Sequence, residues 1–327
     1  MPRFKLGEPQ PFAGVNRLSM SRTYRATAIN LKAMPIGETD RLLTLLTPEL
    51  GVLRVTAPGA RKHLSQLGGR SGLFVINDVL IAKGKRLDKL VQAETLRSFP
   101  GLSQHLGKLT ASQYLAELVL LQALDEQPQP DLYYLFVEHL ERIEASSQSG
   151  ILACLTHGIY HLLALEGVAP DFQTCCVTRR PVVPDLSNPD WRIGFSVAAG
   201  GIFQLSELGR LASGRAAGVY TQSSVVDSAS KHSVRSHRVQ EVESAASSQK
   251  AIAVTQLTAL ELALLQQLSR ADLVTTAQGL ASPVGSGVRQ PHELWMRIER
   301  LLRQYAQYQF DQPIRSAALI DTCFSSK

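Results

Sequence analysis

Aromatic residues and cysteines are scarce in this chain, and long apolar runs are missing. Phe, Trp and Tyr make up 6% of the 327 residues, and the only cysteines are Cys154, Cys175, Cys176 and Cys323. No run of about eighteen apolar residues is present, which argues against a membrane-spanning helix, and no signal peptide is recognisable. Four cysteines without framework spacing are typical of a reducing compartment. We therefore expect a cytoplasmic protein with no membrane partner.

The sequence motifs of common enzyme classes are also missing. No Gly-x-x-x-x-Gly-Lys-Ser/Thr phosphate loop occurs, and no nucleophile stands at motif-level spacing from a plausible base, although catalytic triads need not be local in sequence. His157 and His161 have the spacing of a zinc-protease helix, but position 158 is glycine where that motif needs glutamate. We interpret them as ordinary helix histidines, and we expect neither enzymatic activity nor a cofactor.

Five short strand-like runs lie between residues 24 and 98. In the first run Thr27, Ile29 and Leu31 alternate with more polar positions, which predicts a strand buried on that face alone. The other runs are 41–47, 51–57, 73–82 and 90–96, and the segment 48–51 predicts a hairpin turn between the second and third. Glu38 and Asp40 are expected to cap the turn before the second strand. Five strands in about 75 residues fit an OB-fold barrel, although an SH3-like barrel has a similar pattern.

Positive charge is concentrated in this segment. Residues 20–100 hold 13 Lys and Arg against 6 Asp and Glu, whereas residues 101–327 hold 18 against 21. The cations occupy connections between strands, where such barrels receive nucleic acid, although a solvated surface is the alternative for any charge run. Only Tyr24 and Phe74 are candidates for base stacking, so contacts to the backbone should dominate. The candidate nucleic-acid-binding residues are Arg41, Arg54, Arg61, Lys62, Arg70, Lys83, Lys85, Arg86 and Lys89.

Beyond about residue 101 the apolar period changes to about 3.6 residues, which predicts helices near 114–121, 132–140, 150–167, 257–268 and 291–310. Asp131 is the expected N-cap of the second helix, Gly167 the stop of the third, and Pro291 belongs in the first turn of the last. The predicted fold class is α+β, an N-terminal OB-fold barrel (20–100) followed by an α-helical domain (101–327). Residues 1–19 are expected to be a disordered extension, with Met20 as an alternative start, and 213–250 a mobile Ser- and Ala-rich insertion.

Three segments in series resemble one protein family. They are Ile36-Gly-Glu-Thr-Asp-Arg-Leu-Leu-Thr-Leu-Leu-Thr47, residues 51–62 and residues 86–94, and they resemble the amino-terminal barrel of RecO. Weaker similarity extends to Gly200-Gly201 and to residues 314–320. The resemblance covers roughly residues 20–212 and 255–325.

The resemblance implies a non-enzymatic, nucleoid-associated mediator of DNA repair and recombination. Such a protein binds single- and double-stranded DNA, anneals complementary strands and assists RecA loading onto DNA coated by single-stranded-DNA-binding protein. The implied partners are RecR and the C-terminal tail of the single-stranded-DNA-binding protein, with RecA acting indirectly.

The resemblance also raises the question of zinc, because many RecO proteins carry a four-cysteine module in the segment that corresponds to about 170–207. Here Cys175 and Cys176 are adjacent, and Gln204 and Glu207 occupy the positions of the second pair. Tetrahedral zinc needs ligand pairs with a short spacer, and adjacent cysteines make a poor chelate. We expect no structural zinc. A metal bound by Cys175 with His157 or His161 is the alternative.

Three arginines spaced by three residues along the expected last long helix are candidates for binding an acidic peptide, such as the C-terminal tail of the single-stranded-DNA-binding protein. They are Arg297, Arg300 and Arg303, and a solvated face with Glu299 between them is the alternative.

Two further functions of the chain remain open: an OB-fold RNA-binding adaptor, whose binding would be sensitive to the 2′-hydroxyl of RNA, and a hydrolase that uses the barrel for targeting.

Overall fold

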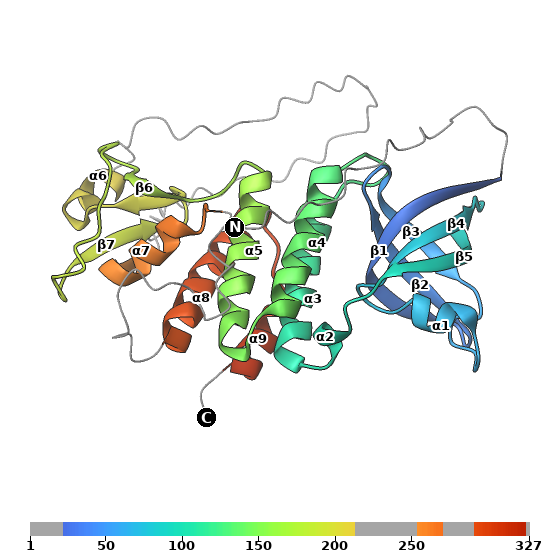
Figure 1. Ribbon diagram of the computed structural model, residues 1–327. Helices are drawn as coiled ribbons and strands as arrows, with labels where there is room; N and C mark the ends of the chain where they lie inside the picture. The colour runs from blue at the N-terminus through green and yellow to red at the C-terminus, as the bar shows by residue number, and fades with distance from the viewer. Residues whose placement is uncertain (1–21, 213–253, 271–290, 325–327) are drawn as a thin grey trace, which may run out of the picture. The chain divides into compact units, whose positions relative to one another are not determined.

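The computed structural model describes residues 22–212, 254–270 and 291–324 (Figure 1). The chain divides into two compact units. The barrel unit comprises the described residues through Ser98 together with Leu124–Pro130, and the helical unit comprises Phe99–Ala123 and the described residues from Asp131 onward. The expected extension at 1–19 and insertion at 213–250 lie outside the described residues. None of the helices in the described ranges is both long and apolar enough to span a membrane.

The barrel unit is a closed five-stranded barrel, so the predicted OB-like fold is confirmed. The strands follow one another in the order β1-β2-β3-β5-β4, and a parallel pairing of β3 with β5 closes the barrel. The short helix α1 lies in the connection between β3 and β4. The elements are β1 (Thr23–Ile36), β2 (Asp40–Thr47), β3 (Gly51–Ala57), α1 (Gln66–Arg70), β4 (Ile76–Ala82) and β5 (Asp88–Arg97).

The predicted face of β1 is buried at Ile29 and Leu31, but the expectation that the strand is buried on that face alone was wrong. Ala26 and Ala28 belong to the buried cluster inside the barrel, and Ile29 is buried as well on the opposite side of the strand. Asn30 is also buried, and its amide donates to the carbonyls of Ser71 and Gly72 at 2.8 and 2.9 Å. The middle of β1 is therefore covered on both faces, and the alanines leave room inside the barrel for larger side chains from β2, β3 and β4.

The predicted hairpin between β2 and β3 is confirmed. Its turn is fixed by hydrogen bonds of the Thr47 side chain and by the glycine at position 51. The Thr47 hydroxyl accepts from the Leu50 amide and donates to the Gly51 carbonyl, each at 3.0 Å. Gly51 has φ of +62°, and a Cβ there would lie 2.3 Å from the Leu124 carbonyl oxygen. The Val52 amide donates to that same carbonyl at 3.0 Å. Only glycine allows this close approach, which attaches Leu124–Pro130 to the barrel unit.

The helical unit contains longer helices, and in Figure 1 α3, α5 and α8 pack side by side. Helix α4 begins at Pro130, so Asp131 lies in its first turn rather than at the predicted N-cap. Gly167 ends α5 as predicted: its φ is +72°, and the next amide, of Val168, bonds to the Leu163 carbonyl at 3.0 Å. The helices are α2 (Pro100–Ser103), α3 (Leu106–Gln122), α4 (Pro130–Ala145), α5 (Ile151–Leu165), α7 (Ala259–Gln267), α8 (Pro291–Phe310) and α9 (Ala317–Phe324).

The helical unit also contains a four-stranded sheet that the sequence analysis did not predict. The strand order is β6-β8-β7-β9. Residue 257, expected to start a helix, lies in β9, because Thr258 is the N-cap of α7 and forms a capping box with Glu261. The elements are β6 (Asp171–Cys175), β7 (Arg192–Ser196), β8 (Gly201–Phe203) and β9 (Val254–Thr258), with the short helix α6 (Leu208–Ala212) and 3-10 turns at Gln148–Gly150 and Leu205–Glu207.

Three histidine rings meet in the core between α4 and α5. The centroid of the His139 ring lies 5.4 and 5.2 Å from those of His157 and His161, which are 3.9 Å from each other. Arg142 donates to Nδ1 of His157 at 3.0 Å, so the proton of that ring is on Nε2, which donates to the Arg270 carbonyl at 2.9 Å. His139 is fully buried, and neither of its ring nitrogens has a hydrogen-bond partner among the described residues.

This environment keeps the three imidazoles neutral. Burial, and then the neighbouring histidines, hold the pKa of His139 well below its ordinary value. Burial and the His161 ring lower the pKa of His157 to about 3, and burial and Arg142 lower that of His161. In the unfolded chain these groups titrate near their ordinary value, so between that pH and the folded pKa the unfolded state binds more protons. Stability is therefore complete above about pH 6.5 and is lost as pH falls.

We predict that acidification below about pH 6.5 destabilises the helical unit, with a slope that approaches about 1.4 kcal/mol per pH unit for each histidine kept neutral. Denaturation followed by tryptophan fluorescence measures this, because Trp191 and Trp295 both lie in the helical unit. His139→Leu should flatten the pH dependence, since an apolar side chain replaces an unpartnered ring. Exposed His63→Gln in the barrel is the control. Equal pH dependence in His139→Leu and wild type would contradict the prediction.

Candidate nucleic-acid interface

One carboxylate fixes the loop that carries Arg61 and Lys62. Asp40 Oδ1 accepts from the Gly59 amide and from the Thr39 hydroxyl, each at 2.8 Å. These two hydrogen bonds, in that order, lower the pKa of Asp40, and the charges of Lys62 and Lys89 lower it further. The Arg61 amide donates to the Thr39 carbonyl at 2.8 Å. Asp40 was expected to cap the turn before β2, and it instead ties that turn to the loop after β3.

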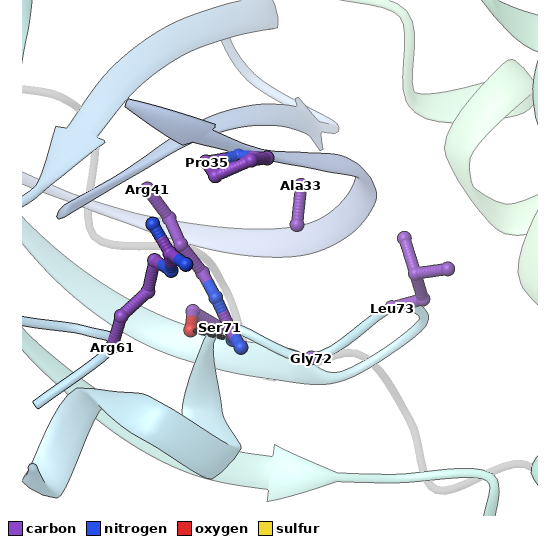
Figure 2. Close-up of a pocket in the computed structure, with 7 residues that line it drawn as sticks. All are labelled: Ala33, Pro35, Arg41, Arg61, Ser71, Gly72 and Leu73. Carbon is purple, nitrogen blue, oxygen red and sulfur yellow. Dashed lines mark hydrogen bonds between the residues drawn. The ribbon is translucent and has the colours of Figure 1, made fainter. Parts of the chain in front are cut away.

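Arg41 and Arg61 line one hollow of about 340 Å³, here called the first basic hollow. Figure 2 shows Arg41 extending from β2 to Ser71, with the guanidinium of Arg61 beside the Arg41 side chain. Arg41 Nη1 donates to Ser71 Oγ at 2.7 Å and to the Gly68 carbonyl at 3.1 Å. Arg61 Nη1 donates to the Gly37 carbonyl at 3.0 Å. Because a guanidinium has five N–H donors, these bonds orient both groups and leave donors for an anion.

The turn between β4 and β5 forms a second basic hollow of about 650 Å³. Asp88 shapes it: Oδ1 accepts from the Gly84 amide at 2.9 Å, and Oδ2 accepts from the Tyr24 hydroxyl at 2.6 Å. Position 84 requires glycine, because a Cβ there would lie 1.9 Å from the Leu87 carbonyl oxygen. The residues that line this hollow are Thr56, Lys83, Gly84, Lys85, Arg86, Leu87 and Lys89.

Six of the nine predicted cations thus line the two hollows, and the other three lie elsewhere. Lys62 is in the loop beside Asp40, and Arg70 ends α1, where its carbonyl accepts from Asn77. Arg54 is exposed on β3, opposite Thr44, and Thr44 is in turn opposite Lys32 of β1. Cross-strand neighbours share a face, so Lys32 and Arg54 flank Thr44 on the outside of the barrel. Sequence reasoning missed Lys32, and only the strand register identifies it.

Neither of the two aromatic residues expected to stack on bases is available for that role. Phe74 is 2% exposed and has φ of +60°, so it is buried in the loop before β4, which begins at Ile76 rather than at residue 73. Tyr24 is half-buried, and burial followed by its hydrogen bond to Asp88 raises its pKa. Both residues hold the barrel together, so electrostatic and backbone contacts have to supply more of any nucleic-acid affinity.

The three arginines of α8 are paired with carboxylates inside the helical unit. Arg297 bonds to buried Glu261 of α7 at 2.9 Å, and Arg300 contacts Asp321 of α9 at 3.1 Å. Arg303 binds Glu299 at 2.5 Å and Asp321 at 2.6 Å. Because the Arg303 side chain is only 13% exposed, it acts as a tie between α8 and α9. An acidic peptide at these arginines stays a prediction, and it would compete with the chain's own carboxylates.

The cysteine-containing segment forms an edge of the four-stranded sheet. Cys175 is buried, and its sulfur accepts from the Thr178 amide at 3.5 Å. Burial alone would raise its pKa, but hydrogen bonds from Thr178, Gln204 and Val177 hold the pKa below the ordinary value. Within the described part of the chain, no three His, Cys, Asp or Glu side chains are arranged to hold a metal ion. The side chains of this segment therefore do not fit the four-cysteine zinc module that many RecO proteins carry here. Whether the segment binds a metal ion stays to be tested by experiment.

Comparison with known proteins agrees with this architecture. The family models described as "Recombination protein O N terminal" and "Recombination protein O C terminal" match residues 20–99 and 103–206. Proteins named DNA repair protein RecO are 49% identical over 314 residues in Nostoc punctiforme, 50% over 307 in a Cyanothece species and 47% over 311 in Acaryochloris marina. Each match covers 94% of this chain and 97 to 98% of the relative. The predicted resemblance is confirmed, and the chain belongs to the RecO family of DNA repair proteins.

Proposed function

We propose that this chain binds single- and double-stranded DNA through the barrel unit, anneals complementary strands, and assists RecA loading onto DNA coated by single-stranded-DNA-binding protein. The observation that carries the proposal is the placement of the cations. Six of them line two hollows on one small barrel, and Lys62 and Lys89 both act on the single carboxylate of Asp40. Family membership supports the role in DNA repair.

The hydrogen bonds around Asp40 and Asp88 support this proposal physically. They hold the backbone of both basic connections, so the cations do not have to be ordered when a phosphate arrives. Contacts of this kind read no sequence and tolerate both strand states. Annealing requires such a protein, because it has to hold single strands before pairing and the duplex afterwards.

We also propose the partners and the place of action. The helical unit is the candidate surface for RecR and for the tail of the single-stranded-DNA-binding protein, and the exposed ends of Arg297 and Arg300 are candidate contacts for the tail. RecA would be affected indirectly, through removal of that protein from DNA. The chain would act at the nucleoid and without catalysis.

Neutralising the loop cations should weaken DNA binding and its salt dependence together. In Arg61→Gln/Lys62→Gln we expect the slope of log K against log salt to fall by about 1.8 for duplex and about 1.4 for single strands, if each cation meets one phosphate. Fluorescence anisotropy with labelled oligonucleotides between 50 and 200 mM salt measures this. Arg179→Gln/Arg180→Gln, an adjacent exposed pair in the helical unit, is the matched control. Equal slopes in the loop variant and wild type would remove the loop from the interface.

Strand annealing tests the whole function. Purified protein should anneal complementary oligonucleotides coated with single-stranded-DNA-binding protein, more slowly at high salt and equally well with and without EDTA, because no step requires a metal. The rate is measured by fluorescence transfer between labelled strands. Absence of both annealing and DNA binding at low salt would contradict the proposal, and tighter binding of structured RNA than of single-stranded DNA would favour the adaptor function instead.

A further inference from the structure

Leu64 stands out on the surface of the barrel unit. Its side chain is 89% exposed, the largest value for any large apolar residue in the described ranges. It follows directly on Arg61, Lys62 and His63, all of which are exposed. The most exposed leucine of the described residues therefore lies at the end of the basic loop, directly before Ser65, the N-cap of α1.

The backbone at Leu64 is held in an unfavourable conformation. Leu64 has φ of +62° and is the third residue of a turn in which the Ser65 amide bonds to the Lys62 carbonyl at 3.2 Å. Glycine or asparagine is preferred at such a position, because the Cβ of leucine lies too close to the following carbonyl oxygen in the left-handed region. The fold supports this strain with hydrogen bonds on both sides: the Lys62 amide bonds to the Gly59 carbonyl at 3.0 Å, and the Ser65 side chain caps α1.

Anchoring of the loop does not explain the leucine. Leu67, three residues later, already packs against the buried cluster of the barrel. Leu64 is exposed to solvent instead, although asparagine or glycine would fit the turn better and expose less apolar surface. Neither packing nor turn geometry favours leucine at this position, which points to a contact outside the free protein.

We propose that Leu64 is a wedge that contacts unpaired, unstacked DNA bases while the adjacent cations hold the backbone. Apolar side chains, leucine among them, insert between base steps of duplex DNA at a cost in unstacking, and that cost is smallest for bases that are already unpaired. Basic neighbours supply the phosphate contacts that place such a side chain. The inference rests on the proposed DNA binding and refines it. It provides the apolar base contact that buried Phe74 and half-buried Tyr24 do not make. It also gives the barrel a means to distinguish single strands from stacked duplex.

The test replaces the leucine without disturbing the turn. Leu64→Asn keeps a residue that tolerates positive φ and adds no charge, so the fold and the salt slope should be unchanged. We expect the affinity for single-stranded DNA to fall about three- to tenfold, less than the loss for an aromatic stacking residue, and the affinity for duplex to stay within about twofold. Leu106→Asn, at a leucine of the helical unit that is 69% exposed, is the matched control.

A second readout reports on the bases directly. Wild type should raise the fluorescence of a 2-aminopurine placed in a single-stranded oligonucleotide, because a wedge unstacks it, and Leu64→Asn should raise it less at saturating protein. Unchanged single-strand affinity and unchanged fluorescence in Leu64→Asn would overturn the wedge. An equal loss on single strands and duplex with a lowered melting temperature would also overturn it, since Leu64 would then be structural. If wild type binds neither DNA, the proposed function itself fails.

Discussion

The hydrogen bond from the Gly59 amide to the Asp40 carboxylate is the contact on which the candidate interface depends. It joins the turn before β2 to the loop after β3, and so fixes where the loop cations and Leu64 stand. Asp40 interacts electrostatically with Lys62 and Lys89, so its negative charge also reduces the repulsion between these cations. A carboxylate inside a candidate phosphate-binding surface is electrostatically unfavourable, but its geometric role outweighs its charge here, because it accepts hydrogen bonds of 2.8 Å from the Gly59 amide and from the Thr39 hydroxyl.

The same arrangement occurs at the second basic hollow. Asp88 holds the Gly84 amide and the Tyr24 hydroxyl, and glycine at position 84 lets the turn close tightly on Leu87. Each basic connection is therefore organised by one acidic residue at a strand end and by a glycine. The barrel supplies rigid strand ends, and the connections supply charge, which is how small barrels commonly separate stability from binding. In the helical unit, Arg303 of α8 forms ion pairs with Glu299 and Asp321 of the same unit instead.

Local patterns in the sequence predicted the elements well, and tertiary packing decided the rest. The turn of the β2–β3 hairpin and the end of α5 at Gly167 are determined by residues close together in the sequence, so the sequence predicts both. The inner face of β1 could not be predicted, because a strand covered on both sides has two apolar faces and a bulge near Asn30 shifts its register. The start of α7 was predictable, since Thr258 and Glu261 have the capping-box spacing. The position of Lys32 and Arg54 on either side of Thr44, and the burial of Phe74, could be seen only in the three-dimensional structure.

The proposed interface places DNA on the barrel at its two basic connections. Hydrogen exchange of the full-length protein, with and without a single-stranded oligonucleotide and followed by mass spectrometry, tests it most directly, because it requires no substitution. We predict slower exchange in the bound protein at residues 59–65 and 83–88, and little change in the helices of the helical unit. Protection confined to the helical unit, with the two connections unchanged, would contradict it.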